Sequence, residues 1–279
     1  MTAPHTPRLA AEVADYYTRR FDEHARLSAS APGVLELVRT QELLRRHLPA
    51  GPASVLDVGG GPGAHACWLT ADGYQVHLVD PVERHVAQAA EAGCSAELGD
   101  ARALSAADSS YDVALLLGPL YHLPEPSDRQ RALAEAMRVV RPGGLVVAAG
   151  IQRFAPLFDN AGHARLHLDE CETRTARVLA KGVNDGKLFT SAYFHRVEDL
   201  ERELRESGLA EVCAYGVEGP GEALLKAAEV ATGRRVPVES DLFRSALVAA
   251  RTAEPHPELR VTSSHLLAFG WRPGQAATS

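Results

Sequence analysis

The stretch with the clearest potential for chemistry runs from Val55 to His65 and reads VLDVGGGPGAH. Glycine has no Cβ, so Gly59, Gly61 and Gly63 allow the backbone to turn sharply and a ligand to approach it closely. Gly59-x-Gly61-x-x-Ala64 also fits the dinucleotide-binding fingerprint, a weak pattern when it stands alone. The turn therefore predicts a ligand pocket, either for a phosphate group or for a ligand that has none.

Three carboxylates end three successive strand candidates: Asp57 before the glycine turn, Asp80 in VHLVDP and Asp100 in AELGD. Because ligands bind outside the carboxyl ends of strands in an open parallel sheet, we expect these acids to face one pocket. Asp57 would repel a pyrophosphate but would complement an ammonium or a sulfonium group. Asp80 is placed to accept hydrogen bonds from two ribose hydroxyls, and Asp100 from an adenine amino group. A cationic nucleoside suits these acids better than a dinucleotide.

Apolar runs that alternate with helical segments indicate how these residues are positioned. Strands are predicted over 54–58, 75–79, 95–98, 111–117, 145–149, 210–219 and 264–272. Helices are predicted over 8–27, 34–48, 83–92, 127–140 and 196–209. Short apolar strands that alternate with helices are typical of a parallel sheet covered on both faces.

The chain is expected to form a helical lid over residues 1–50 and one main domain over 51–279. The regular alternation stops after Gly150, and helical insertions are predicted at about 151–195 and 217–260. We expect the lid and both insertions to form a cap that encloses a small substrate, because RNA or a folded protein needs an open face.

In this order and spacing, the motifs resemble those of the class I S-adenosylmethionine-dependent methyltransferases. The matching segments are VLDVGGGPG, Asp80, GDA at 99–101, YDVALLLGPLYHL and LAEAMRVVRPGGLVVA, which together cover residues 54–150. The resemblance implies a Rossmann-like doubly wound α/β sheet of about seven strands, with the last strand antiparallel. It also implies S-adenosylmethionine as methyl donor and S-adenosylhomocysteine as product. The implied donor-binding residues are Asp57, Gly59, Gly61, Gly63, Asp80, Asp100, Ala101, Leu117 and Tyr17.

Tyr121 and His122 are the candidate catalytic residues, since they follow the fourth predicted strand in LLLGPLYHLPEP. In the resembled fold, the carboxyl end of this strand borders the transferring methyl group. His122 is a candidate general base for an acceptor that must lose a proton. The alternative, that its imidazole only packs or holds the loop, stays open, and Tyr121 is more typical of a pocket wall.

Aromatic residues of the predicted cap are candidates for substrate contacts. Tyr16 and Tyr17 lie where many small-molecule methyltransferases have a helical lid. Further aromatic candidates for the walls of the acceptor site are Phe154, Phe158, Tyr193, Phe194 and His195. His163 and His167 are four residues apart but lack a third ligand, so we predict no metal site.

Composition limits the kinds of molecule that the protein is expected to bind. A net charge of −7 argues against binding nucleic acid through its phosphates, and no apolar run reaches the roughly 20 residues that span a bilayer. Four widely spaced cysteines and no visible secretory signal suit a cytoplasmic protein, and the arginine- and alanine-rich composition suggests a bacterial source. A homo-oligomer is left open.

The predicted function is methyl transfer to a small molecule such as an aromatic or heteroaromatic specialised metabolite. Three alternatives remain at this stage: an RNA or protein methyltransferase, a non-catalytic S-adenosylmethionine-binding protein, and a nicotinamide dehydrogenase.

Overall fold

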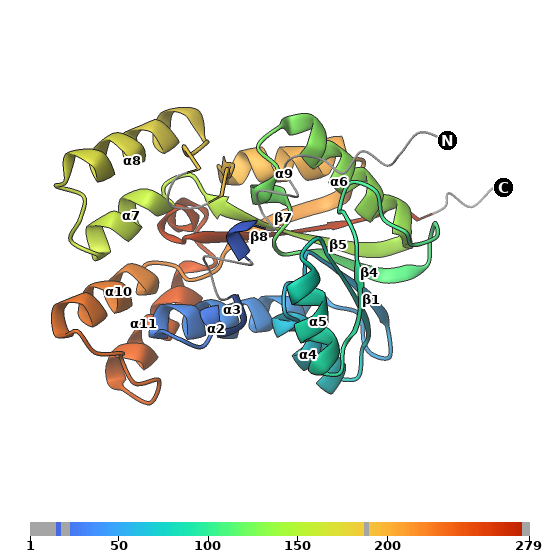
Figure 1. Cartoon of the computed structure of the whole chain (residues 1–279), viewed down its shortest axis with the longest axis horizontal. Helices are drawn as coiled ribbons and strands as arrows, with labels where there is room; N and C mark the ends of the chain where they lie inside the picture. The colour runs from blue at the N-terminus through green and yellow to red at the C-terminus, as the bar shows by residue number, and fades with distance from the viewer. Residues whose placement is uncertain (1–14, 18–22, 187–189, 275–279) are drawn as a thin grey trace.

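The computed structural model describes residues 15–17, 23–186 and 190–274 (Figure 1). Its eight-stranded sheet has the order β3-β2-β1-β4-β5-β8-β7, and β6 pairs with β5 outside this path. The strands are β1 Ser54–Val58, β2 Gln75–Asp80, β3 Ser95–Leu98, β4 Tyr111–Leu116, β5 Val140–Gln152, β6 Phe194–His195, β7 Ala210–Gly216 and β8 His265–Trp271. β8 runs antiparallel to both β5 and β7. The predicted sheet with an antiparallel last strand is therefore confirmed.

Helices cover both faces of the sheet, as Figure 1 shows. α3 (Ala31–His47), α4 (Ala64–Ala71) and α5 (Glu83–Glu91) lie on one face, and α6 (Pro126–Val139) and α9 (Val197–Glu206) lie on the other. Each face has its own apolar core. One core includes Leu43 of α3 and Leu69 of α4, and the other includes Leu133 of α6 and Leu200 of α9. Short apolar strands are buried on both sides, as their sequences predict.

Four helices extend from one end of the sheet, on the left in Figure 1: α7 (Ala155–Gly162), α8 (Asp169–Lys181), α10 (Gly221–Thr232) and α11 (Asp241–Ala253). Two short 3₁₀ turns, η1 (Leu120–His122) and η2 (Pro257–Thr262), complete the loops, and α2 (Glu23–Arg26) precedes α3. A third apolar cluster joins Leu35 of α3 to Leu225 of α10 and Phe243 of α11. Within the described ranges, no helix combines the length and apolar character needed to cross a membrane.

Two local expectations differ from the structure, and a third concerns residues mostly outside the described ranges. The fifth strand, predicted over 145–149, already begins at Val140, so the RPGG segment at 141–144 lies within β5, and the register with β4 shifts between Tyr111 and Val113. His163 and His167 do not share a helical face, since α7 ends at Gly162 and His163 is its C-cap. The helix expected over 8–27 lies largely outside the described residues.

A buried ion pair fixes the 3₁₀ turn that carries Tyr121 and His122. The Arg129 guanidinium donates to both carboxylate oxygens of Glu203 at 2.8–3.0 Å, so it joins α6 to α9. It also donates to the carbonyl oxygens of Leu123 and Pro124, each at 2.8 Å, directly after the turn. The ion pair therefore anchors the far end of the loop after β4, directly behind the turn that carries Tyr121 and His122.

We expect Arg129→Met to lower the free energy of unfolding by about 3–5 kcal/mol, because it leaves the buried Glu203 carboxylate without its cation. Urea denaturation monitored by circular dichroism measures this loss. Arg202→Met on α9, next to Glu203 in the sequence, is the matched control: the Arg202 side chain is 54% exposed, so its loss should change stability by less than about 0.5 kcal/mol. Equal effects of the two substitutions would contradict a structural role for the buried pair.

Candidate active site

The glycine turn after β1 forms part of a cavity of about 150 Å³ at the carboxyl edge of the sheet. Gly59 and Gly61 line this cavity and have φ angles of 69° and 57°, which side chains rarely adopt. A Cβ on Gly60 would lie 2.6 Å from Oδ2 of Asp57, so the turn packs directly against this carboxylate. Gly63 is the N-cap of α4, with φ of 92°, and is not among the lining residues.

Asp57 is fully buried at the end of β1 and lines the same cavity. Among the residues that the structure describes, neither of its carboxylate oxygens has a hydrogen-bond partner. Burial, together with repulsion from Asp80, raises the pKa of Asp57 to about 7. A buried carboxylate without a partner is costly, and a cationic ligand would offset this cost.

The other two predicted carboxylates line the cavity but are held by the protein. Asp80 accepts hydrogen bonds from the backbone N–H groups of Gly61 and Val82, each at 2.9 Å, which ties the end of β2 to the glycine turn. Asp100 forms a two-pronged ion pair with Arg102, at 2.7 and 3.0 Å. Ala101 and Leu117, also predicted from the sequence, complete this wall.

The aromatic candidates near the turn after β4 form a hydrogen-bonded chain. The Tyr17 hydroxyl lies 2.9 Å from Nε2 of His122, and Nδ1 of His122 lies 2.8 Å from the Thr190 hydroxyl. Burial lowers the pKa of His122 to about 3, so its ring is neutral. Burial also raises the pKa of Tyr121 well above its ordinary value. The chain joins the N-terminal segment, η1 and the first insertion above the cavity.

A second, larger cavity of about 590 Å³ lies between the insertions and the first cavity. Five residues line both cavities: Tyr17, Glu23, Arg26, Tyr121 and His265. We name the smaller one the donor cavity, because most of the predicted donor-binding residues line it, and the larger one the acceptor chamber. Of the aromatic candidates for substrate contacts, Tyr16 and Phe194 line the chamber.

Four predicted wall residues do not line either cavity: Phe154, Phe158, Tyr193 and the fully buried His195. The Tyr193 ring instead packs beneath the Arg129 guanidinium, 3.8 Å from its centre. The chamber wall is more polar than the predicted aromatic wall. Its charged residues include Asp159, Arg165, Arg174, Arg177, Asp185, Glu222 and Lys226.

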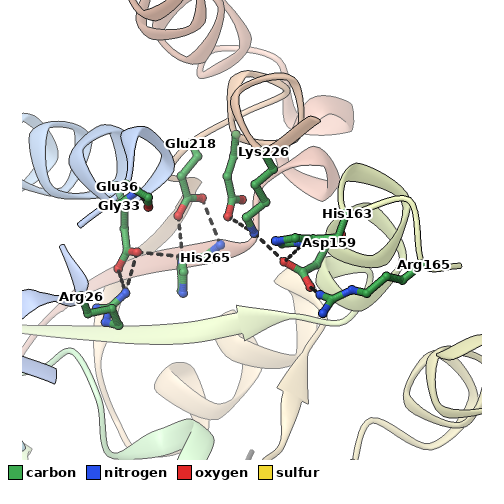
Figure 2. A network of polar contacts seen from close by, with 11 residues as sticks. Arg26, Gly33, Glu36, Asp159, His163, Arg165, Glu218, Lys226 and His265 are labelled. Atoms are coloured by element: carbon green, nitrogen blue, oxygen red, sulfur yellow. Dashed lines mark hydrogen bonds and ion pairs between the residues drawn. The ribbon is translucent and has the colours of Figure 1, made fainter. Parts of the chain in front are cut away.

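Sequence analysis missed a cluster of charges where the two cavities meet, shown in Figure 2. Arg26 of α2 donates to both oxygens of Glu36 of α3, at 2.7 and 2.9 Å. Glu218, after β7, is hydrogen-bonded to Nδ1 of His265 at the start of β8. These residues come from four separate parts of the chain and fall in no short motif, so no sequence signal could have found them.

Comparison with known proteins agrees with the fold and the glycine turn. Residues 56–148 match a family model described as a methyltransferase domain. Methyltransferase GfsG of Streptomyces halstedii is 31% identical over 189 residues, which are 64% of this chain and 66% of that protein. An uncharacterized methyltransferase of Mycobacterium sp. strain KMS is 41% identical over 99 residues, which are 35% of this chain and 38% of that protein. The matched segment thus spans only about two fifths of the latter's length.

The fold has solved counterparts as well. The crystal structure of an S-adenosylmethionine-dependent methyltransferase from Thermotoga maritima, described as a possible histamine N-methyltransferase, has a TM-score of 0.59, and the match covers 93% of this chain and 99% of that one. At 21% identity this likeness concerns the fold alone. The fold and the glycine-turn site define a class I methyltransferase architecture. The chain belongs to the class I S-adenosylmethionine-dependent methyltransferase family, and residues 56–148 match the model of its methyltransferase domain.

The raised pKa of Asp57 leads to a stability prediction. Its folded pKa of about 7 exceeds the ordinary value, so ionisation is disfavoured in the folded state. This cost is absent below pH ~4 and grows as pH rises through 7. Asp57→Asn should therefore gain stability relative to wild type between pH 4 and 8, by up to about 4 kcal/mol at about 1.4 kcal/mol per pKa unit.

Urea denaturation of the ligand-free protein at several pH values checks this expectation. Asp72→Asn is the matched control, because Asp72 lies on the surface in an ion pair with Arg45 and lines neither cavity. A stability difference between wild type and Asp57→Asn that does not change with pH would contradict the raised pKa.

Proposed function

We propose that this protein transfers the methyl group of S-adenosylmethionine to a small-molecule acceptor. The observation that carries the proposal is Asp57, a buried carboxylate that lies in a glycine-lined cavity and has no hydrogen-bond partner in the described ranges. S-adenosylmethionine carries an ammonium and a sulfonium group, and either cation would offset the cost of burying this charge. A pyrophosphate in the same place would add a negative charge beside Asp57 and Asp80.

The donor cavity offers groups for each part of this ligand. Asp57 is assigned to the cationic methionine end, and Gly59 and Gly61 let the ligand approach the backbone. Asp80 is assigned to the ribose hydroxyls, since its carboxylate lies at the tip of β2. Asp100, Ala101 and Leu117 are assigned to the adenine. Asp100 can accept from the adenine amino group only if a lone pair remains beside Arg102.

The acceptor chamber fits a small molecule with polar groups. Its volume of about 590 Å³ lies in the range of cavities that enclose drug-sized ligands. Apolar residues such as Ile151 and Val178 share its wall with charged residues of both signs. A polar specialised metabolite, aromatic or not, suits this mixture, and the Tyr16 side chain is assigned to its binding.

The protein contributes mainly alignment and exclusion of water. The donor already carries a good leaving group, so transfer is an in-line displacement at the sulfonium methyl group, accelerated by holding the two reactants together. The chain Tyr17–His122–Thr190 is assigned to holding the N-terminal segment over the donor cavity. His122 has both ring nitrogens engaged by protein groups, so we assign it this positioning role in preference to that of the general base.

Donor binding should depend on Asp57 and on pH. The ionised carboxylate binds a cation better than the neutral form, so affinity should rise about eightfold from pH 6 to 7.5 around a pKa of about 7. Asp57→Asn should weaken binding by about 1.5–3 kcal/mol, the worth of a hydrogen bond to a charged group, and should abolish the rise. Titration calorimetry with S-adenosylmethionine measures both effects, and Asp72→Asn should match wild type. Equal affinity at every pH would remove Asp57 from the donor site.

The activity itself is tested with S-adenosylmethionine that carries a labelled methyl group. Purified protein and donor are added to an extract of the producing cells, which is then split into small-molecule, RNA and protein fractions. We expect label in the small-molecule fraction, and much less of it with Asp57→Asn at limiting donor concentrations. Mass and fragmentation of the labelled product then identify the methylated atom.

The other outcomes decide between the remaining functions. Label in RNA or protein would replace the proposed acceptor class and keep the fold. No label in any fraction, together with intact donor binding by calorimetry, would favour a binding protein without turnover.

A further inference from the structure

His265 stands at the edge of the sheet where the ligand-binding strands end. It begins β8 and pairs with Ile151 near the end of β5. Because β8 is antiparallel, its start lies at the same edge as the carboxyl ends of β1, β4 and β5. His265 lines both the donor cavity and the acceptor chamber, so it lies at their junction.

Glu218 fixes the orientation of the His265 ring. One oxygen of this fully buried carboxylate is hydrogen-bonded to Nδ1 of His265, and the other accepts the backbone N–H of the same residue at 3.1 Å. Glu36 lies 3.7 Å from the same Nδ1. Figure 2 shows both carboxylates approaching the same edge of the ring. This arrangement keeps a proton on Nδ1 and directs the opposite edge of the ring away from both acids.

The second ring nitrogen is the one available for chemistry. In the part of the chain that the structure describes, Nε2 of His265 has no hydrogen bond or ion pair, and the side chain is 25% exposed. A histidine whose Nδ1 is held by a carboxylate and whose Nε2 faces a cavity has the arrangement of a general base.

We propose that His265, oriented by Glu218, accepts the proton of the acceptor group as that group is methylated. The inference rests on the proposed function and applies to a hydroxyl or N–H acceptor. The acceptor's O–H or N–H bond breaks, and its proton passes to Nε2. The freed electron pair forms the bond to the methyl carbon, while the carbon–sulfur electron pair returns to sulfur and gives the neutral thioether. The imidazolium that results is stabilised by Glu218 and Glu36.

His122, the base expected from the sequence, is less suited to this step. Both of its ring nitrogens are bonded to Tyr17 and Thr190, and it lines the donor cavity but not the acceptor chamber. Burial lowers the pKa of His122 to about 3, which makes it a weak base. His265 differs in each of these respects.

Charge around His265 sets the pH at which it can act. The charged groups near it are Arg26 of α2, Glu36 of α3, Glu218 after β7, and Glu222 and Lys226 of α10. Burial alone lowers the pKa of His265, but attraction from Glu36 and Glu218 outweighs it and raises the pKa to about 9. The base is the neutral ring, so activity should rise as pH approaches 9. A bound cationic donor would move this rise toward lower pH.

The same cluster invites comparison with a cation site, because ligand atoms of Glu36, Glu218 and His265 lie within 4.8 Å of one another. Arg26 already neutralises Glu36, however, and Glu218 already binds Nδ1 of His265. The negative charges of the two glutamates are therefore compensated by the Arg26 guanidinium and the protonated His265 ring. A divalent cation would have to displace these contacts, which the experiment below can detect.

The test compares three variants in the labelled-methyl assay, with the small-molecule fraction of the extract as acceptor source. His265→Gln should reduce transfer by about 10²–10⁴-fold and leave donor affinity in calorimetry within about twofold of wild type. Glu218→Gln keeps an acceptor oxygen for Nδ1 but removes the charge, so the rise of activity should move to lower pH. His256→Gln is the matched control, because His256 is exposed and lines neither cavity; its activity should equal that of wild type.

Several results would overturn the inference alone. These are full activity of His265→Gln, an unchanged pH profile in Glu218→Gln, or activity that EDTA abolishes and Mg²⁺ restores, which would make the cluster a cation site. Failure of wild-type protein to label any fraction would instead refute the proposed function, and the inference with it.

Discussion

An ionised carboxylate without a partner is expensive to bury, yet Asp57, near the end of β1, has no hydrogen-bond partner among the residues that the structure describes. Its place is set by the sheet, because it pairs with Leu78 of β2 on one side and with Leu115 of β4 on the other. A cationic ligand in the cavity beside it would offset the cost. The cost of burying the Asp57 charge therefore favours a cationic ligand beside the glycine turn, where a ligand can approach the backbone most closely. In this way the fold favours a cationic methyl donor.

The neighbouring carboxylates, Asp80 and Asp100, also need compensating partners. Asp80 is satisfied by the backbone of the turn and Asp100 by Arg102, so their charges are already compensated in part. Of these three acids, Asp57 alone has both oxygens without a hydrogen-bond partner within the described part of the chain. Three acids at equivalent places in the sheet thus differ in their environments. The electrostatic attraction of the cavity for a cation is concentrated where the methionine end of the donor is assigned.

Sequence predicted the part of the site that follows strand ends in order along the chain. Glycine spacing and strand-end acids depend on local backbone geometry, so Asp57, Gly59 and Asp80 could be placed in one cavity without coordinates. The acceptor side could not. Glu36, Glu218 and His265 lie on elements far apart in sequence, and only the antiparallel insertion of β8 between β5 and β7 brings them together. Tyr193 was misplaced because a guanidinium, invisible as a partner in the sequence, packs over its ring.

Two histidines show why residue type alone does not assign chemistry. His122 and His265 both lie at the same edge of the sheet, and Nδ1 of each ring has a hydrogen-bond partner. A hydroxyl partner leaves His122 neutral and its Nε2 committed to Tyr17, whereas carboxylates raise the proton affinity of His265 and its Nε2 faces the cavities. A base must combine proton affinity with access to the acceptor. Here the proton affinity comes from Glu36 and Glu218 together, and the access comes from Glu218, which holds one edge of the ring and thereby presents the other.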